Sequence, residues 1–113
     1  RFSMNESETI EEEVYHFGET TFCYNNNELR TRSSRVLITS RQADILRLLA
    51  KNIGNVVSKE MIQEAVWGTV SYANSLAVNV QMTYLRHALQ HDATVKIESL
   101  KKKGYVLSVI SPE

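Results

Sequence analysis

The stretch from Asn74 to His91, NSLAVNVQMTYLRHALQH, restricts the fold more than any other feature, because it predicts the longest helix in the chain. Its apolar residues recur with the period of an α-helix, so that Val78, Met82, Leu85 and Leu89 share one stripe. Such a stripe is stable in water only when other elements cover it. We therefore expect this helix to pack against a core.

The opposite side of the same predicted helix is also partly apolar, with Leu76, Val80, Thr83, Tyr84 and His87. A merely solvated face rarely carries Leu, Val and Tyr together. Arg86 is the only formally charged side chain between positions 74 and 91. An acid-free face that is apolar and able to form hydrogen bonds suits a polyanion with readable edges, such as a DNA groove. A second contact with the core is the alternative reading of the pattern.

Charge is distributed unevenly along the chain. The 113 residues include 13 basic and 13 acidic side chains, and this neutral total argues against a nucleic-acid partner. However, residues 1 to 28 hold seven acids and one base, so residues 29 to 113 carry a net charge of +6. Cys23 is the single cysteine, which excludes an internal disulfide and fits a reducing compartment. No apolar run approaches the length that spans a membrane.

The chain is long enough for one domain, which we expect at residues 13–110 between a disordered acidic lead at 1–12 and a tail at 111–113. Alternating β-branched, aromatic and polar residues predict up to four short antiparallel strands near 13–17, 20–24, 28–32 and 35–38. Asn25, Asn26 and Asn27 predict a turn, since asparagine tolerates left-handed backbone angles.

Two further helices are expected before the long one. The first follows Thr39 or Ser40, with Ala43, Leu46, Leu49 and Ala50 inward, Ile45 and Leu48 on the flanks, and Gly54 as its C-cap. The second follows Ser58, ends at Gly68, and turns Ile62, Ala65 and Val66 to the core. A loop at 69–73 leads into the long helix, and this succession predicts a helix-turn-helix.

Residues 95–110 predict a β-hairpin. In the first strand Val95 and Ile97 alternate with Lys96 and Glu98. In the second strand Tyr105, Leu107 and Val109 alternate with Val106, Ser108 and Ile110, and the tip between the strands is formed by Lys101, Lys102, Lys103 and Gly104. Three lysines at one tip repel one another and would be relieved by phosphates. A solvated turn is the alternative interpretation.

Several motifs together resemble the OmpR/PhoB-type DNA-binding domain of bacterial transcription regulators. They are the run ITSRQADILRLLAKN-x-GNVVSK from Ile38 to Lys59, VWG at 66–68, LR at 85–86 and GY at 104–105, and the match covers about residues 13–110. The resemblance implies an α+β fold, a winged helix-turn-helix with an N-terminal four-stranded antiparallel sheet, a three-helix bundle and a C-terminal β-hairpin wing. It also implies sequence-specific binding to double-stranded DNA, with the long helix in the major groove and the wing on the backbone or in the minor groove.

Carried over position by position, the resemblance predicts which residues contact DNA. Ala77 and Val80 would pack on thymine methyl groups, Gln81 would pair with an adenine edge, and Tyr84 would donate a hydrogen bond or stack along the backbone. The full predicted set is Ala77, Val80, Gln81, Thr83 and Tyr84 toward the bases, Trp67, Arg86 and Tyr105 toward the phosphates, His87 on the outer face of the helix, and Ser99, Lys101, Lys102 and Lys103 in the wing. For Trp67 a place in the core is the alternative.

This chain departs from the family at Thr83, Tyr84 and His87, where many members carry basic residues. Bidentate reading of guanine is therefore unavailable from this face, and we expect an A·T-rich site, weak binding by a single domain, or dependence on a second subunit. Family members bind tandem half-sites as dimers, which would compensate for a weak single domain. RNA polymerase or a second regulator is a further expected partner, although the uncharged loop at 69–73 gives no support for the polymerase contact. The expected location is the bacterial cytoplasm, and a branch with ToxR/CadC-like members places this domain in an inner-membrane-anchored regulator.

Two other classes of function compete with DNA binding. An enzyme is not expected, because the three histidines and Cys23 form no convergent set, and His87 with His91 lacks a third metal ligand. The sequence likewise implies no cofactor, no metal and no small-molecule ligand. The second alternative is a winged-helix module for protein–protein contact that binds DNA weakly or only with a partner regulator.

Overall fold

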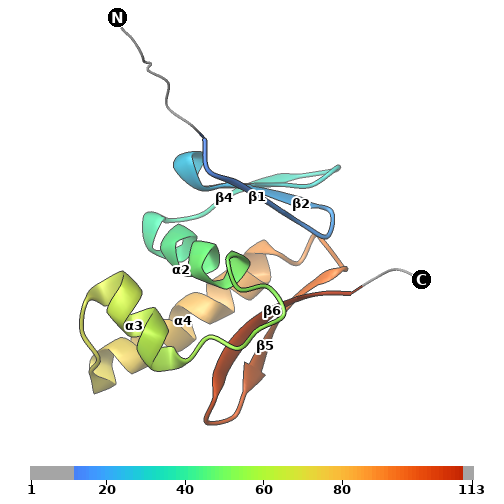
Figure 1. Cartoon of the computed structure of the whole chain (residues 1–113). Coiled ribbons are helices and arrows are strands. Elements are labelled where there is room, and N and C mark those ends of the chain that lie inside the picture. The colour runs from blue at the N-terminus through green and yellow to red at the C-terminus, as the bar shows by residue number, and fades with distance from the viewer. Residues whose placement is uncertain (1–11, 111–113) are drawn as a thin grey trace, which may run out of the picture.

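The computed structural model describes residues 12–110, and it places a four-stranded sheet and a two-stranded hairpin around three helices (Figure 1). This arrangement confirms the predicted α+β winged helix-turn-helix. The predicted lead and tail lie almost wholly outside the described residues. In chain order the elements are β1 (Val14–Phe17), β2 (Thr20–Cys23), the 3-10 helix η1 (Tyr24–Asn26), β3 (Glu28–Arg30), β4 (Arg35–Leu37), α2 (Ser40–Ala50), α3 (Lys59–Trp67), α4 (Tyr72–Ala88), β5 (Val95–Leu100) and β6 (Gly104–Val109).

The N-terminal sheet is fully antiparallel, in the order β1-β2-β3-β4, and confirms the four predicted strands. The asparagine triplet makes the turn between β2 and β3, with Asn27 in the left-handed region at a φ of 51°. Asparagine adopts this conformation at low cost, which is why the triplet predicted the turn correctly.

Helix α2 begins at a capping box. Thr39 accepts a hydrogen bond from the Gln42 backbone N–H, and the Gln42 side chain accepts one from the Thr39 N–H. The helix ends at Ala50 with Lys51 as its C-cap, so the prediction that Gly54 caps it was wrong. Gly54 is left-handed, with a φ of 83°, but it lies in the following turn, where its N–H donates to the Leu107 carbonyl at 2.9 Å.

Helix α3 begins after Ser58, which accepts from the Met61 N–H, and it ends at the left-handed Gly68, as predicted. Its inward face differs by one position from the expectation, since Ala65 is exposed and Gln63 is buried. The buried amide oxygen is satisfied because Gln63 Oε1 accepts from the Ser71 N–H at 3.0 Å. This hydrogen bond fixes the turn between α3 and α4.

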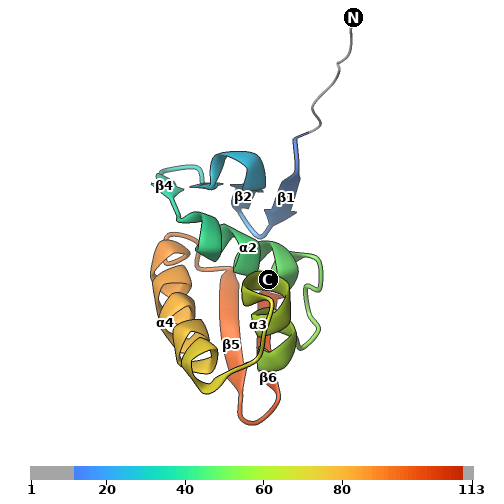
Figure 2. The same cartoon turned by 90° about the vertical axis from the view of Figure 1, so that its left-hand side faces the viewer.

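Helix α4 starts at Tyr72, two residues before the predicted start, because Ser71 acts as the N-cap and accepts from the Asn74 N–H. Residues 72 and 73 therefore belong to the helix and not to the loop. It ends at Ala88, three residues before the predicted end. In Figure 2 the helix runs beside β5 of the hairpin, which it contacts.

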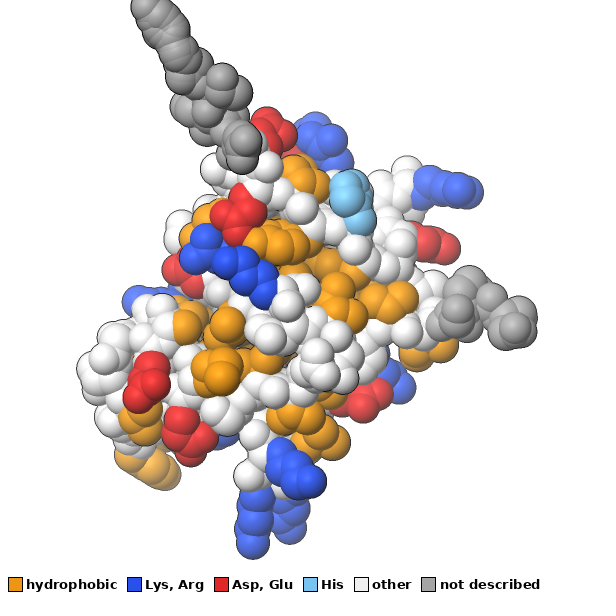
Figure 3. All heavy atoms as spheres, in the orientation of Figure 1, with side chains coloured by type: hydrophobic (Ala, Val, Ile, Leu, Met, Phe, Trp, Pro, Cys, Tyr) orange, Lys and Arg blue, Asp and Glu red, His pale blue; other side chains and the backbone are white. Residues whose placement is uncertain are grey.

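The hairpin β5–β6 is hydrogen-bonded to the link between α2 and α3. Val57 and Tyr105 exchange two backbone hydrogen bonds, of 2.8 and 2.9 Å. Tyr105, Val106 and Leu107 are buried in succession, in place of the expected alternation, and Val109 is exposed. Figure 3 shows basic side chains gathered at the hairpin tip, which carries Lys101, Lys102 and Lys103 and projects away from the rest of the domain.

A buried carboxylate joins the N-terminal sheet to this hairpin. Asp92, which is 2% exposed, accepts hydrogen bonds from the Glu19 N–H at 2.8 Å, the Thr20 hydroxyl at 2.7 Å and the Thr94 N–H at 2.9 Å. Burial alone would raise the pKa of Asp92, but the hydrogen bonds from Thr94, Thr20 and Glu19 outweigh it and lower that pKa. The charged form of Asp92 therefore stabilises the fold.

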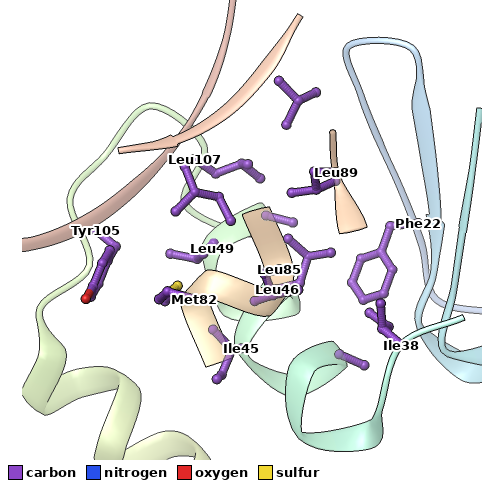
Figure 4. Packing of buried hydrophobic residues seen from close by; sticks show 14 of the residues in the cluster. Phe22, Ile38, Ile45, Leu46, Leu49, Met82, Leu85, Leu89, Tyr105 and Leu107 are labelled. Atoms are coloured by element: carbon purple, nitrogen blue, oxygen red, sulfur yellow. The ribbon is translucent and has the colours of Figure 1, made fainter. Parts of the chain in front are cut away.

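The core lies where the three helices, the N-terminal sheet and the hairpin meet (Figure 4). The predicted stripe of α4 supplies its centre, with Val78, Met82 and Leu85 fully buried and Leu89 5% exposed. Ile45 was expected on the flank of α2 but is fully buried, because α3, α4 and the sheet all pack on α2. Other members of the core are Phe17, Phe22, Leu29, Ile38, Leu46, Leu49, Val57, Ile62, Val95, Ile97 and Leu107.

Candidate nucleic-acid interface

The outer face of α4 is accessible along the whole helix, as the sequence pattern indicated. Leu76, Val80 and Tyr84 are 47%, 49% and 56% exposed, and Thr83 and His87 are exposed beside them. The second core contact considered for this face is therefore absent from the described part of the chain. Thr83 donates its hydroxyl to the Asn79 carbonyl at 3.2 Å, which leaves its oxygen lone pairs and methyl group for a ligand.

One edge of this face, formed by Ala77 and Gln81, lies against the start of α2. Both residues are half-buried. Gln42 Nε2 donates to Gln81 Oε1 at 3.1 Å, so the side-chain amide of Gln81 is already engaged on one side. The expected pairing of Gln81 with an adenine edge uses both its oxygen and its nitrogen, and the bond from Gln42 occupies one of the two lone pairs of that oxygen.

The other edge of α4 lies against the wing through a polar cluster. The Tyr105 hydroxyl donates to Asn79 Oδ1 at 2.8 Å, and Arg86 Nε donates to the Ile97 carbonyl at 3.0 Å. The Arg86 guanidinium also lies 5.9 Å from the centre of the Tyr105 ring. Burial raises the pKa of Tyr105, which keeps its hydroxyl a proton donor.

These contacts change the expected role of Tyr105. It is only 6% exposed, and its one donor is directed at Asn79, so it positions the wing on α4 and has no free hydroxyl hydrogen for a phosphate. Arg86 keeps its remaining N–H groups and is exposed, as a phosphate contact requires. Sequence patterns could not reveal this, because Tyr105 and Asn79 are 26 positions apart.

A basic groove opens between the wing tip, α4 and the start of α3. It has a volume of about 260 Å³ and is lined by Lys59, Glu60, Asn79, Ser99, Leu100, Lys101, Lys102, Lys103, Gly104 and Tyr105. Four of these residues are cationic and one is anionic. The structure thus brings the predicted wing residues together with Lys59 and Asn79, which were not predicted. The sequence indicates a DNA contact only weakly at these two positions, because Lys59 is a single lysine after a helix cap and Asn79 is a single polar residue beside an apolar stripe.

Trp67 lies at the C-terminal end of α3, half-buried and packed against the core cluster. Its ring is covered by the exposed Arg41, whose guanidinium carbon lies 4.7 Å from the ring centre and whose Nη1 donates to the Val66 carbonyl at 3.1 Å. The packing of Trp67 against the core agrees with the alternative interpretation, and its contact with a phosphate stays a prediction. Arg41 was missed because nothing local distinguishes it from other helix arginines.

The composition of this surface indicates its chemistry. The outer face of α4 carries no acid, and cations flank it at the wing tip, at Lys59 and at Arg86. Among residues 12–110 no cluster of three or more His, Cys, Asp or Glu side chains could hold a metal ion. In the same range, no helix is both long and apolar enough to cross a membrane.

The chain resembles known bacterial regulators and solved DNA-binding domains. It is 26% identical to the transcriptional regulatory protein RprY of Bacteroides fragilis over 103 residues, 91% of this chain and 44% of that protein. It is 32% identical to the response regulator ArlR of Staphylococcus aureus over 81 residues, 71% of this chain and 37% of that protein. The chain thus spans less than half the length of these relatives.

The structural comparison gives the same fold. The DNA-binding domain of CpxR from E. coli superposes with a TM-score of 0.76 at 20% identity, covering 88% of this chain and 99% of that one. The DNA-binding domain of E. coli CadC gives a TM-score of 0.74 at 23% identity over 90% and 96% of the two chains. Fold and surface together define a winged-helix DNA-binding domain.

Residues 33–107 match the family described as "Transcriptional regulatory protein, C terminal". The chain belongs to this family, the OmpR/PhoB-type DNA-binding domains of transcription regulators. Its function is accordingly sequence-specific DNA binding in transcription regulation.

Proposed function

We propose that the domain binds its operator with α4 in the major groove and with the wing tip on the backbone or in the minor groove beside it. One observation carries this proposal: the acid-free outer face of α4 lies next to a groove that holds Lys59 and three wing lysines. A major groove accommodates an α-helix, and the phosphates that border it are separated by about 12 Å, within reach of cations on either side of that helix.

The contacts divide into two kinds. Val80, Ala77, Thr83 and Tyr84 face the bases, and their methyl and ring groups suit thymine methyls. Lys59, Arg86 and the wing lysines supply charge that is independent of sequence. No arginine or lysine lies on the outer face itself, so bidentate reading of guanine by a basic side chain is absent there. These features support an A·T-rich half-site.

A second subunit on the DNA is part of the proposal. A face that reads mostly methyl groups gives a single domain little specificity, and two domains on adjacent half-sites would multiply their binding constants. The domain would act in the bacterial cytoplasm, where the DNA is. Attachment to an inner-membrane segment, contact with RNA polymerase and pairing with a second regulator remain hypotheses drawn from the resemblance.

Salt dependence of binding tests the proposal. The affinity of the domain for random-sequence and A·T-rich duplexes is measured at several salt concentrations, beside a Lys101→Ala, Lys102→Ala, Lys103→Ala variant. The slope of log K against log salt is negative, and each lost phosphate contact reduces its magnitude by about 0.9. The slope of the variant should therefore be shallower by about 2 to 3. Lys51→Ala, at the end of α2, is the control and should leave the slope unchanged.

Two outcomes would contradict the proposal. Binding that hardly responds to salt would indicate an apolar protein-contact surface, the alternative considered from the sequence. No binding by the folded domain at low salt would indicate that a partner regulator is required.

A further inference from the structure

A chain of hydrogen bonds runs from the capping box of α2 to the outer face of α4. The first bond joins the Thr39 N–H to Gln42 Oε1 at 3.0 Å, and the second joins Gln42 Nε2 to Gln81 Oε1 at 3.1 Å. Each bond constrains the next. Because the oxygen of Gln42 accepts in the capping box, its nitrogen faces α4 as a donor, and Gln81 accepts that hydrogen bond with its oxygen.

These two successive hydrogen bonds, from Thr39 through Gln42 to Gln81, which we call the relay, determine which half of the Gln81 amide is available to DNA. Its oxygen is directed at α2 and accepts there through one lone pair, so its NH₂ group, with two hydrogens, is the half turned away from α2. Thr39, Gln42 and Gln81 are 3 and 39 positions apart in sequence, and the relay exists only because α2 packs on α4.

We propose that this relay makes Gln81 a hydrogen-bond donor in the major groove, so that it selects a keto base, guanine or thymine, at one operator position. At the exocyclic position in that groove, guanine O6 and thymine O4 accept hydrogen bonds, whereas cytosine N4 and adenine N6 donate them. The purine N7 accepts in both guanine and adenine, so the preference for a keto base applies to a contact at the exocyclic group. The inference rests on the proposed function, since it requires α4 in the major groove. It replaces the adenine pairing expected from the sequence, and it makes Gln42 a positioning residue for base selection.

The variant Gln42→Glu provides a sharp test, because it reverses the relay and preserves the helix cap. A glutamate at this position completes a capping box with Thr39 equally well. Its carboxylate accepts and cannot donate, so it would accept from Gln81 Nε2 and turn the Gln81 oxygen toward the groove. The preferred base should then change from a keto base to an amino base, adenine or cytosine.

The experiment selects bound sequences from a randomised duplex library with the wild-type domain and three variants. Wild type should favour guanine or thymine about fivefold or more at one position, and Gln81→Ala should lose that preference. Gln42→Glu should favour adenine or cytosine at the same position and leave the rest of the site unchanged. Gln90→Glu, which adds the same charge beyond the end of α4, should keep the wild-type preference.

The outcomes separate this inference from the proposed function. An unchanged keto preference in Gln42→Glu, or a site that Gln81→Ala leaves intact at every position, would overturn the relay and leave DNA binding in place. Failure of the folded wild type to enrich any sequence would refute the proposed function itself.

Discussion

Replacing Gly104 with alanine should destabilise the domain strongly, because this glycine lets the wing approach the link between α2 and α3. Its φ is 142°, a conformation that residues with a side chain rarely adopt. A Cβ atom there would overlap the Val57 carbonyl oxygen and would come within 2.8 Å of the Ser58 Cα. Both obstacles are backbone atoms, so no side chain can move aside.

The magnitude follows from two contributions. The strained backbone costs about 2 kcal/mol. Moving the wing away from Val57 weakens the two hydrogen bonds that Val57 and Tyr105 exchange, at about 1 kcal/mol each. We expect Gly104→Ala to lower the free energy of unfolding by about 4 kcal/mol in total, a large part of the stability of a domain of this size.

Urea denaturation followed by the fluorescence of Trp67, the only tryptophan, measures this change. Gly68→Ala is the matched control, since Gly68 is also left-handed, at 83°, but has open space where its Cβ would lie. That variant should lose about 1 kcal/mol from the backbone conformation alone. Equal losses for the two variants would refute the reasoning that the wing packs against Val57 through Gly104.

Three further substitutions separate stability from binding. Asp92→Asn should lower the free energy of unfolding by about 1 to 3 kcal/mol in urea at pH 7, because an amide cannot accept from all the donors around it. The lowered pKa of Asp92 means that the wild type gains stability from the charged form above the unfolded pKa and loses it as the pH falls through the folded pKa. Denaturation at several acidic pH values should therefore show a weaker pH dependence in Asp92→Asn, and an identical dependence would contradict this. Tyr105→Phe should cost about 1 kcal/mol of stability through loss of the bond to Asn79, and an unchanged urea midpoint would argue against that bond. Val80→Ser should change stability by less than about 0.5 kcal/mol but weaken binding to duplex DNA, as fluorescence anisotropy would show; unchanged affinity would remove Val80 from the interface.

The parts of the fold that depend on local pattern could be predicted from the sequence. The period of Val78, Met82 and Leu85 identified the buried side of α4, and Ser58 with Gly68 marked both ends of α3. Likewise, the alternation around the lysine tip predicted the wing. These features require only neighbours within a few residues, which a sequence displays directly.

The details that depend on distant partners could not be predicted. Tyr105 was expected to contact phosphate, but its hydroxyl is engaged by Asn79 across the interface between wing and helix. The link at Val57 pairs with Tyr105 of the hairpin, and three successive residues of β6 are buried in place of the expected alternation. No period in the sequence encodes which polar atoms meet when helices pack, so residues such as Gln42 acquire their roles only in the fold.

The face that binds DNA can be located directly by NMR, with a ¹⁵N-labelled domain titrated with an A·T-rich duplex at low salt. We expect the largest amide shifts on the outer face of α4 around Val80 and Tyr84, on the start of α3 at Lys59, and on the wing tip at Lys101–Lys103. The strands β1 and β2 should change little. Shifts concentrated on that sheet, or in the groove lined by Asp44 and Lys51, would contradict the assignment of α4 and the wing as the DNA-binding surface.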